Sequence, residues 1–178
     1  MPWKIREVDR KADRRSISAI DTSFETQRIY EVAVATHSIG LVERTVEPAI
    51  RKSYPMADAF APWSTWDTGW VALDDDNGVA LGFAAVEYEA WHARLVLWHL
   101  YVARSHRRSG IGRALLGLVE EYGRSRGAKR VWLETTSVNV PGIAAYGRLG
   151  YMLVGVDTTV YDTLPYEDEA AVYLAKLL

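Results

Sequence analysis

The sequence predicts an α/β fold with a central mixed, mostly antiparallel β-sheet that is flanked by helices on both sides. Short apolar segments with alternating or β-branched residues recur along the chain, as is typical of strands. A long amphipathic segment at residues 111–126 has helical spacing and separates two of these strands. The chain has 178 residues, of which 49% are apolar and 25% charged, so we expect one globular domain spanning residues 1–178.

The N-terminal part of the chain contains three predicted strands and one predicted helix. They are, in order, an edge strand at residues 3–8, a helix at 12–20, and a hairpin of strands 28–35 and 41–46 around the sequence THSIG. Residues 52–70 follow and are the least regular part, because Pro55 and Pro62 interrupt regular structure.

Strands dominate the rest of the prediction. Residues 70–73 and 79–88 flank the sequence DDDNG, in which Asn77-Gly78 is a turn signal. The elements expected after this hairpin are a strand at 95–102, the helix at 111–126, a strand at 129–135, and late strands at 152–160 and 170–177. Neither an internal repeat nor an interdomain linker is evident, which agrees with a single domain.

Composition excludes several classes of function. The net charge is −2 and the one basic run, residues 104–113, is too short for a nucleic-acid surface, so we expect no nucleic-acid partner. The chain has no cysteine, which excludes disulfides, a thiol nucleophile and cysteine-based metal sites. The N-terminal residues lack the apolar core of a secretory signal, and no apolar run reaches membrane-spanning length. We therefore expect a cytoplasmic protein with no membrane partner.

The run RRSGIG at residues 107–112 is the most informative stretch, because it separates a predicted strand from a predicted helix. Backbone N–H groups at a helix N-terminus lack intrahelical partners, and the helix dipole adds partial positive charge there. Glycines at positions 110 and 112 allow close approach, so this turn is suited to bind phosphate. The spacing differs from a P-loop, which needs Gly-Lys-Ser/Thr, and from the dinucleotide fingerprint, which needs a third glycine.

A second motif, NVPGIAAYGRLGY at residues 139–151, follows the strand at 129–135. The turn, the strand and this motif, taken in order, resemble the GNAT superfamily of N-acetyltransferases, and the motif positions are filled by Asn139, Tyr146, Gly150 and Tyr151. Further segments are similar to the streptothricin and nourseothricin acetyltransferases within that superfamily, among them AIDTSFETQRIYEV at 19–32 and GVDTTVYDTLPYEDEAAVY at 155–173.

This resemblance implies a GNAT-type fold, acetyl-CoA as the cofactor and no metal. It implies that pantetheine lies along the strand before the turn, where a bulge frees an N–H group to polarise the thioester carbonyl. By motif position, Tyr146 donates a proton to the leaving thiolate, and Asn139 positions pantetheine or the acceptor. The remaining cofactor-binding residues implied by the resemblance are Leu100, Tyr101, Val102, Arg107, Arg108, Ser109, Gly110, Ile111, Gly112 and Arg113.

The sequence does not identify the general base. Family members often carry acidic residues on the strand before the turn, but the matching positions here are Trp98, His99 and Tyr101. Glu87 and Glu89 lie two residues apart on the preceding strand and therefore share one face. The candidates are Glu87 and His99, followed by Glu89, Glu134 and a water-relayed path; each carboxylate can equally be a solvated surface group, and His99 can be a hydrogen-bonded residue of the sheet.

The acceptor is expected to be a small-molecule primary amine, most closely a streptothricin-like antibiotic. Nourseothricin-type enzymes carry an acidic insertion where this chain has a tryptophan-rich segment at residues 63–70, in which the rings can hold a cation or simply pack in the core. Substrate-binding candidates are Glu89, Trp66 and Glu134, and further negative potential is expected from Asp21, Glu25, Asp157, Asp162 and residues 166–169.

Two alternatives remain open. One is a GNAT enzyme that acetylates another small amine or a protein amine, and the other is a non-catalytic acyl-CoA sensor. A homodimer is compatible with the resemblance because dimers are common among its members.

Overall fold

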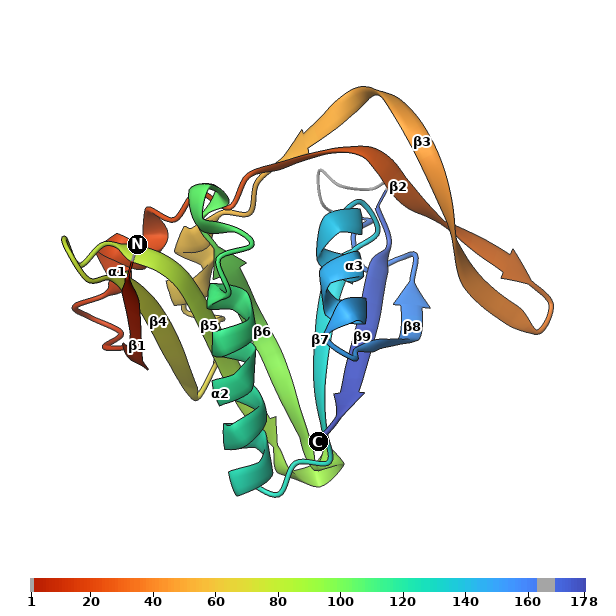
Figure 1. Ribbon diagram of the computed structural model, residues 1–178. Coiled ribbons are helices and arrows are strands. Elements are labelled where there is room, and N and C mark those ends of the chain that lie inside the picture. The colour runs from red at the N-terminus through yellow and green to blue at the C-terminus, as the bar shows by residue number, and fades with distance from the viewer. Residues whose placement is uncertain (1, 163–168) are drawn as a thin grey trace. The chain divides into compact units, whose positions relative to one another are not determined.

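The computed structural model describes residues 2–162 and 169–178, and the chain forms two compact units (Figure 1). Unit 1 comprises residues 1–24, 53–131 and 178, and unit 2 comprises residues 25–52 and 132–177. Each unit is described by itself below. Within the described ranges, no helix is both long and apolar enough to cross a membrane.

Unit 1 contains four strands in the order β1-β4-β5-β6, and each neighbouring pair is antiparallel. Their bounds are Trp3–Glu7 for β1, Thr68–Asp74 for β4, Ala80–Glu89 for β5 and Arg94–Val102 for β6. The predicted edge strand at the N-terminus is confirmed, since β1 ends this order. The predicted turn between β4 and β5 is also confirmed, and Gly78 adopts a φ of +70° in it.

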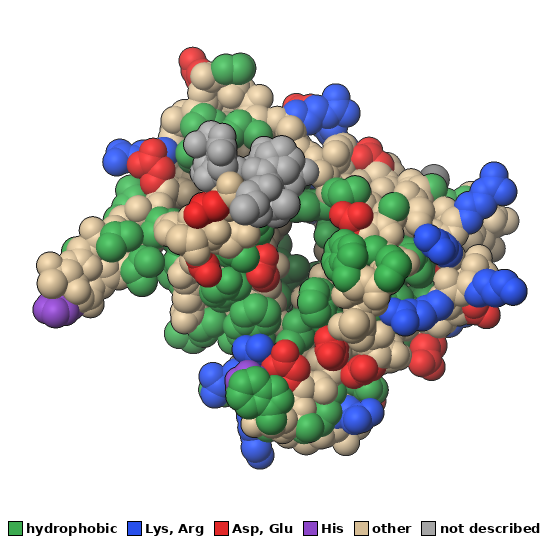
Figure 2. Space-filling model, turned by 180° about the vertical axis from the view of Figure 1, so that it is seen from behind, with side chains coloured by type: hydrophobic (Ala, Val, Ile, Leu, Met, Phe, Trp, Pro, Cys, Tyr) green, Lys and Arg blue, Asp and Glu red, His purple; other side chains and the backbone are tan. Residues whose placement is uncertain are grey.

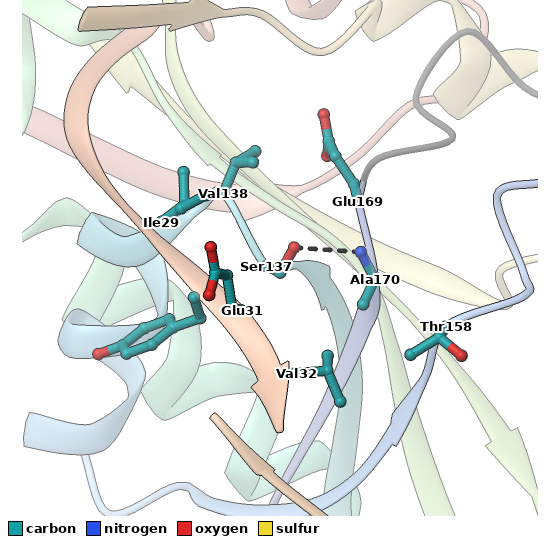
Figure 3. Close-up of a pocket in the computed structure, with 9 residues that line it drawn as sticks. Ile29, Glu31, Val32, Ser137, Val138, Thr158, Glu169 and Ala170 are labelled. Atoms are coloured by element: carbon teal, nitrogen blue, oxygen red, sulfur yellow. Dashed lines mark hydrogen bonds between the residues drawn. The ribbon is translucent and has the colours of Figure 1, made fainter. Parts of the chain in front are cut away.

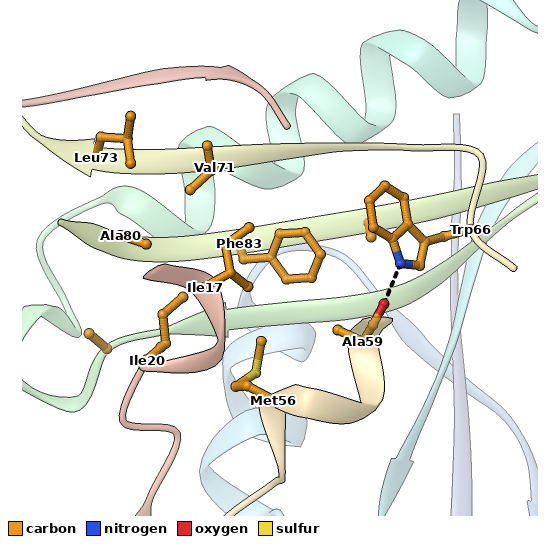
Figure 4. Packing of buried hydrophobic residues seen from close by; sticks show 11 residues of the cluster. Ile17, Ile20, Met56, Ala59, Trp66, Val71, Leu73, Ala80 and Phe83 are labelled. Atoms are coloured by element: carbon orange, nitrogen blue, oxygen red, sulfur yellow. Dashed lines mark hydrogen bonds between the residues drawn. The ribbon is translucent and has the colours of Figure 1, made fainter. Parts of the chain in front are cut away.

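Helices cover both faces of the strands of unit 1. On one face lies α2 (Ile111–Ser125), and it approaches so closely that a Cβ added to Gly82 would come within 2.7 Å of the Ile111 side chain. On the other face, α1 (Arg14–Ser18) and the short helix η1 (Met56–Phe60) pack on β4 and β5 through a cluster of buried residues (Figure 4). Phe83 and Ile17 are fully buried in that cluster. Two further single-turn helices, η2 (Ala90–His92) and η3 (Arg104–His106), flank β6.

Unit 2 contains the hairpin of β2 (Phe24–Ala35) and β3 (Ser38–Lys52), of which Phe24 is assigned to unit 1. It also contains β7 (Arg130–Thr136, from Trp132 on), the helix α3 (Val140–Arg148), β8 (Met152–Asp157) and β9 (Ala171–Leu177). Strand β9 lies between β7 and β8, and its pairing with β8 is antiparallel. The predicted hairpin is confirmed, but its strands extend beyond residues 28–35 and 41–46, to Phe24–Ala35 and Ser38–Lys52.

A predicted helix and a predicted strand are shorter than expected. The helix expected at residues 12–20 spans only Arg14–Ser18, because Asp9 and Asp13 organise the preceding residues as a turn. The Asp9 carboxylate accepts the N–H groups of residues 11 and 12, and the Asp13 carboxylate accepts the Asp9 N–H. The strand expected at 152–160 ends at Asp157, whose carboxylate accepts the Thr159 N–H at 2.7 Å and forms a turn.

Candidate active site

The turn between β6 and α2 has the backbone that the sequence predicts for a phosphate site. Helix α2 begins at Ile111 as expected, and its N-cap is Gly110 with a φ of +92°. No side chain caps this helix, so its first N–H groups lack both intrahelical and side-chain partners of the capping type. Arg108 also adopts a positive φ, of +67°, which is uncommon for a residue other than glycine.

The two glycines of the turn leave space that protein atoms do not fill. A Cβ added to Gly110 would meet no atom within 4 Å, and one added to Gly112 would lie in ordinary contact with Val102, at 3.5 Å. Arg108 and Arg113, which precede and follow the two glycines in the sequence, are exposed. The turn therefore fits a diphosphate, which backbone N–H groups, the helix dipole and two cations would hold together.

Arg107 braces the turn instead of extending from it. Its Nη2 donates to the Thr22 carbonyl at 2.8 Å and its Nε donates to the Val102 carbonyl at 3.3 Å. Burial lowers the pKa of Arg107, although the charge of Asp21 acts in the opposite direction. The side chain thus joins the end of β6 to residue 22. Ile111 is fully buried, so its side chain belongs to the core.

Strand β6 carries a bulge two residues before the predicted pantetheine segment. The register pairs Ala85 with His99 and Val86 with Leu97, so Trp98 has no opposite residue on β5. Beyond it, Leu100 pairs with Ala84 and Val102 with Gly82, on the face covered by α2. Tyr101 points to the other face, where its ring packs against His99 and Tyr54.

His99 is buried among apolar groups. Its ring stacks on Phe83 with a centroid separation of 5.8 Å, its Nε2 lies 3.3 Å from Ser64 Oγ, and its Nδ1 has no hydrogen-bond partner. Burial lowers the pKa of His99 from 6.5 to about 4. The ring is consequently neutral near pH 7 and is a weak base in this setting.

Glu87 and Glu89 differ in their partners although both lie on β5. Glu87 Oε2 accepts from Trp98 Nε1 at 2.8 Å and from Thr65 Oγ1 at 3.2 Å, and both donors are neutral. Glu89 instead pairs with Arg94 at 2.7 Å and with His92 at 2.9 Å. Burial acts to raise the pKa of Glu89, but the hydrogen bonds from Arg94 and His92 outweigh it and hold the pKa below its ordinary value.

Trp66 lies in the core of unit 1. Its side chain is 3% exposed, and its Nε1 donates to the Ala59 carbonyl at 2.7 Å. The guanidinium of Arg10 lies 3.6 Å from the ring centroid and covers the ring. A substrate-binding role for Trp66 stays a prediction, and its surroundings are those of a packing residue.

In unit 2, Asn139 caps α3. Its Oδ1 accepts the Gly142 N–H at 3.1 Å, and its Nδ2 donates to Thr135 Oγ1 at 2.9 Å. A Cβ at Gly142 would collide with this amide, which explains the glycine. Tyr146 lies two turns along the same helix and is half-buried, with its ring edge-on to Tyr151 at 5.5 Å. The cap thus fixes the start of the helix that carries Tyr146.

Glu134 lies on β7 and accepts a hydrogen bond from Tyr161 at 2.8 Å. Of the acidic segment expected at 166–169, only Glu169 is described, and residues 166–168 lie outside the described residues. Among the described residues, no group of three or more His, Asp or Glu side chains is placed to hold a metal ion.

The structure brings Glu87 and His99 together in unit 1, since the adjacent Ser64 and Thr65 contact one each. Asn139, Tyr146 and Glu134 belong to unit 2. Ser64, Thr65 and Trp98 were missed as site residues by sequence reasoning, because no local signal marks them as partners of Glu87 and His99.

On the face shown in Figure 2, acidic and basic side chains of the described residues are interspersed, in line with a net charge of −2.

The fold, the glycine turn and the motif residues are those of a transferase that binds a phosphate-bearing acyl donor. A model of the acetyltransferase (GNAT) family matches residues 27–151, and the chain belongs to this family. The protein is therefore an N-acetyltransferase that uses acetyl-CoA as its donor.

Individual relatives agree with this assignment. A streptothricin acetyltransferase of Streptomyces lavendulae is 36% identical over 172 residues, which cover 93% of this chain and 90% of that protein. A crystal structure of nourseothricin acetyltransferase aligns over 99% of both chains with a TM-score of 0.88 and 36% identity. A Bacillus anthracis protein solved in complex with acetyl coenzyme A shares the fold, with a TM-score of 0.81 and 22% identity over 100% of this chain and 99% of that one. The predicted GNAT fold is confirmed.

The buried His99 generates a prediction on stability. In the unfolded chain its pKa returns to 6.5, so the folded protein binds fewer protons than the unfolded protein between pH 6.5 and about 4. The free energy of unfolding therefore keeps its full value above pH 6.5 and decreases as the pH falls from 6.5 to about 4. The total loss is about 3 kcal/mol. Urea unfolding of His99→Phe, near neutral pH and near pH 4, should show a smaller acid loss than the wild type. Equal losses would contradict the assigned environment.

The glycine turn generates a second prediction. Gly112→Ala places a Cβ in ordinary contact with Val102, so the thermal midpoint should be unchanged or slightly raised. The added methyl would nevertheless occupy the space proposed for the diphosphate, and acetyl-CoA affinity should fall about tenfold or more. Isothermal titration calorimetry checks this, with Gly117→Ala on the exposed side of α2 as the control. Equal acetyl-CoA affinity in both variants would place the diphosphate elsewhere.

Proposed function

We propose that this acetyltransferase acetylates a primary amine of a streptothricin-like antibiotic and so inactivates it. The observation that carries the proposal is the 36% identity to a streptothricin acetyltransferase over 93% of this chain. That similarity extends beyond the glycine turn and the Asn139 motif, which any acetyl-CoA enzyme of the family needs. This extent of similarity supports an acceptor of the same class.

On the donor side, acetyl-CoA supplies an acetyl group activated as a thioester. The N–H groups of residues 108–113 and the exposed Arg108 and Arg113 would hold its diphosphate. Leu100, Tyr101 and Val102 offer their backbone to pantetheine. The bulge at Trp98 changes the register of β6 just before this segment, which supports the expected N–H donor to the thioester carbonyl.

On the acceptor side, the amine must lose a proton before its nitrogen can attack. A lysine-like amine has a pKa of about 10, so the neutral form costs roughly 4 kcal/mol near pH 7. We assign the base to Glu87, because the donors that its carboxylate has among the described residues, Trp98 Nε1 and Thr65 Oγ1, are neutral. His99 is a weak base in its buried setting, and Glu89 is already paired with Arg94.

Tyr146 is assigned as the proton donor to the leaving group. As the amine nitrogen forms its bond to the carbonyl carbon, the bond from that carbon to sulfur breaks, and the sulfur takes the proton held on Tyr146 Oη. Support comes from its place on α3, a helix whose start is fixed by the Asn139 cap. In this proposal Asn139 acts mainly by positioning α3.

We propose that residues 1–178 form a single catalytic domain. We propose that the enzyme is cytoplasmic, because acetyl-CoA is available in the cytoplasm. A homodimer stays a prediction.

The test of this function is acetyl-CoA-dependent release of free CoA thiol with streptothricin, alongside polyamines, aminoglycosides, amino acids and a basic protein. We expect saturable release with streptothricin and an increase in product mass of one acetyl group. Release of CoA thiol only with another small amine, or only with the protein, would show that a streptothricin-like antibiotic is not the acceptor. Binding of acetyl-CoA without release for any acceptor would instead favour a sensor.

Variants of the two assigned catalytic residues test the mechanism. Glu87→Gln and Tyr146→Phe should each lower kcat by about 10²-fold, while the Kd for acetyl-CoA changes little, because neither group holds the diphosphate. Glu89→Gln is the matched control on the same strand and should keep kcat within a few-fold. If Glu89→Gln is the more damaging change, the base is misassigned, and if Tyr146→Phe loses acetyl-CoA binding equally, Tyr146 is structural.

A further inference from the structure

Unit 2 contains a cavity of about 360 Å³ that none of the assigned catalytic residues lines (Figure 3). Its walls come from β2, from the segment after β7, from the residue after β8 and from the two residues before β9. The lining residues are Ile29, Tyr30, Glu31, Val32, Ser137, Val138, Thr158, Glu169 and Ala170. The volume is within the range of small-molecule sites, which runs from about 300 to 1,000 Å³.

Backbone hydrogen bonds fix the cavity wall. The Tyr30 N–H donates to the Ser137 carbonyl at 3.0 Å, and the Ser137 N–H donates to the Ala170 carbonyl at 2.9 Å. The Ala170 N–H donates in turn to Ser137 Oγ at 3.1 Å, as the dashed line in Figure 3 marks. Because the donors and acceptors of these three hydrogen bonds are already paired, we expect other side chains of the cavity to recognise a ligand.

Two carboxylates line the cavity, and their existing partners differ in exposure. Glu169 pairs with Lys52, and both side chains are nearly buried, at 12% and 7% exposed. Glu31 pairs with Arg44 of β3 at 2.9 Å, and these side chains are 54% and 59% exposed. An exposed ion pair contributes little stability, so a ligand cation can replace Arg44 at Glu31. The buried pair of Glu169 and Lys52 is costly to break and serves as a fixed wall.

The cavity also begins next to a residue of the acetyltransferase motif. Ser137 and Val138 directly precede Asn139, the cap of the helix that carries Tyr146. Ile29, Val32 and Val138 add apolar surface to the wall. A ligand that occupies this space would meet apolar side chains around its body and a replaceable carboxylate at one wall.

We propose that this cavity binds a second cationic group of the acceptor, an ammonium or guanidinium distinct from the amine that is acetylated, and that Glu31 is the carboxylate that holds it. The inference rests on the proposed function, because it requires an acceptor with more than one positive charge. Glu31 then selects polycationic acceptors over monoamines. Arg44 occupies the carboxylate when no acceptor is bound.

The hairpin offers a matched control for this role. Glu43 on β3 pairs with Arg28 on β2 at 3.1 Å, with both side chains exposed, so it mirrors the pair of Glu31 with Arg44. Glu43 does not line the cavity. Glu31→Gln and Glu43→Gln therefore remove the same charge and the same kind of ion pair from one hairpin, and only the first removes it from the cavity.

The experiment compares steady-state kinetics of these variants with streptothricin and with a monoamine that the wild type accepts. Glu31→Gln should raise KM for streptothricin by about fivefold to tenfold at unchanged kcat, and should leave KM for the monoamine and for acetyl-CoA unchanged. Glu43→Gln should change none of these. Arg44→Gln should act in the opposite direction and lower KM for streptothricin, because it removes the competing cation.

Equal effects of Glu31→Gln and Glu43→Gln on KM would overturn the inference, because general surface charge would then explain the change. So would an effect of Glu31→Gln that is equal for streptothricin and the monoamine. Calorimetric binding of streptothricin to the enzyme without acetyl-CoA separates the two proposals. Weaker binding by Glu31→Gln alone supports the cavity even if wild-type turnover is absent, whereas turnover with equal binding in all variants supports the function and rejects the cavity.

Discussion

The backbone conformation at the start of α2 is the constraint on which the rest of the site depends. Gly110 adopts a φ of +92° and Arg108 one of +67°, so the chain reverses from β6 into α2 within a few residues. This reversal presents the first N–H groups of the helix to a ligand without a capping side chain. Arg107 holds the turn in place by bonding to the carbonyls of Thr22 and Val102. Arg107, which the sequence assigns to the cofactor, thus bonds to carbonyl groups of the protein itself.

Burial and pairing decide which titratable groups remain available for chemistry. His99 and Glu87 contact the adjacent residues Ser64 and Thr65. Burial lowers the pKa of His99 to about 4, whereas the Glu87 carboxylate accepts hydrogen bonds from neutral donors. Glu89 is on the same strand as Glu87 and forms an ion pair with Arg94. In unit 2, the same logic separates Glu169, which is committed to Lys52, from Glu31, which has an exposed partner. The charge of a side chain therefore does not by itself identify a site residue. The burial and the charge of its hydrogen-bond partner must be considered as well.

Local signals in the sequence predicted the glycine turn, the hairpins and the succession of strands along the chain, because each depends on residues close together in the chain. The Asn139 motif was also found, although its side chain proved to be the cap of α3, for which the sequence Asn-Val-Pro-Gly is a local signal. The burial of Trp66 under Arg10 and the environment of His99 depend on segments far apart in sequence. Alternation of residue types cannot reveal them. The cavity of unit 2 was missed for the same reason, since residues 30, 137 and 170 build it through long-range backbone pairing.

The most direct test of the account is a titration of the isotope-labelled protein with acetyl-CoA, followed by backbone amide resonances. The account predicts that the largest saturable shifts occur at the amides of residues 108–113, with smaller shifts along residues 100–102. Amides of the cavity, such as those of Glu31 and Ala170, should respond to the acceptor and not to acetyl-CoA. Saturable binding that leaves the amides of residues 108–113 unmoved would contradict the assignment of the turn as the phosphate site.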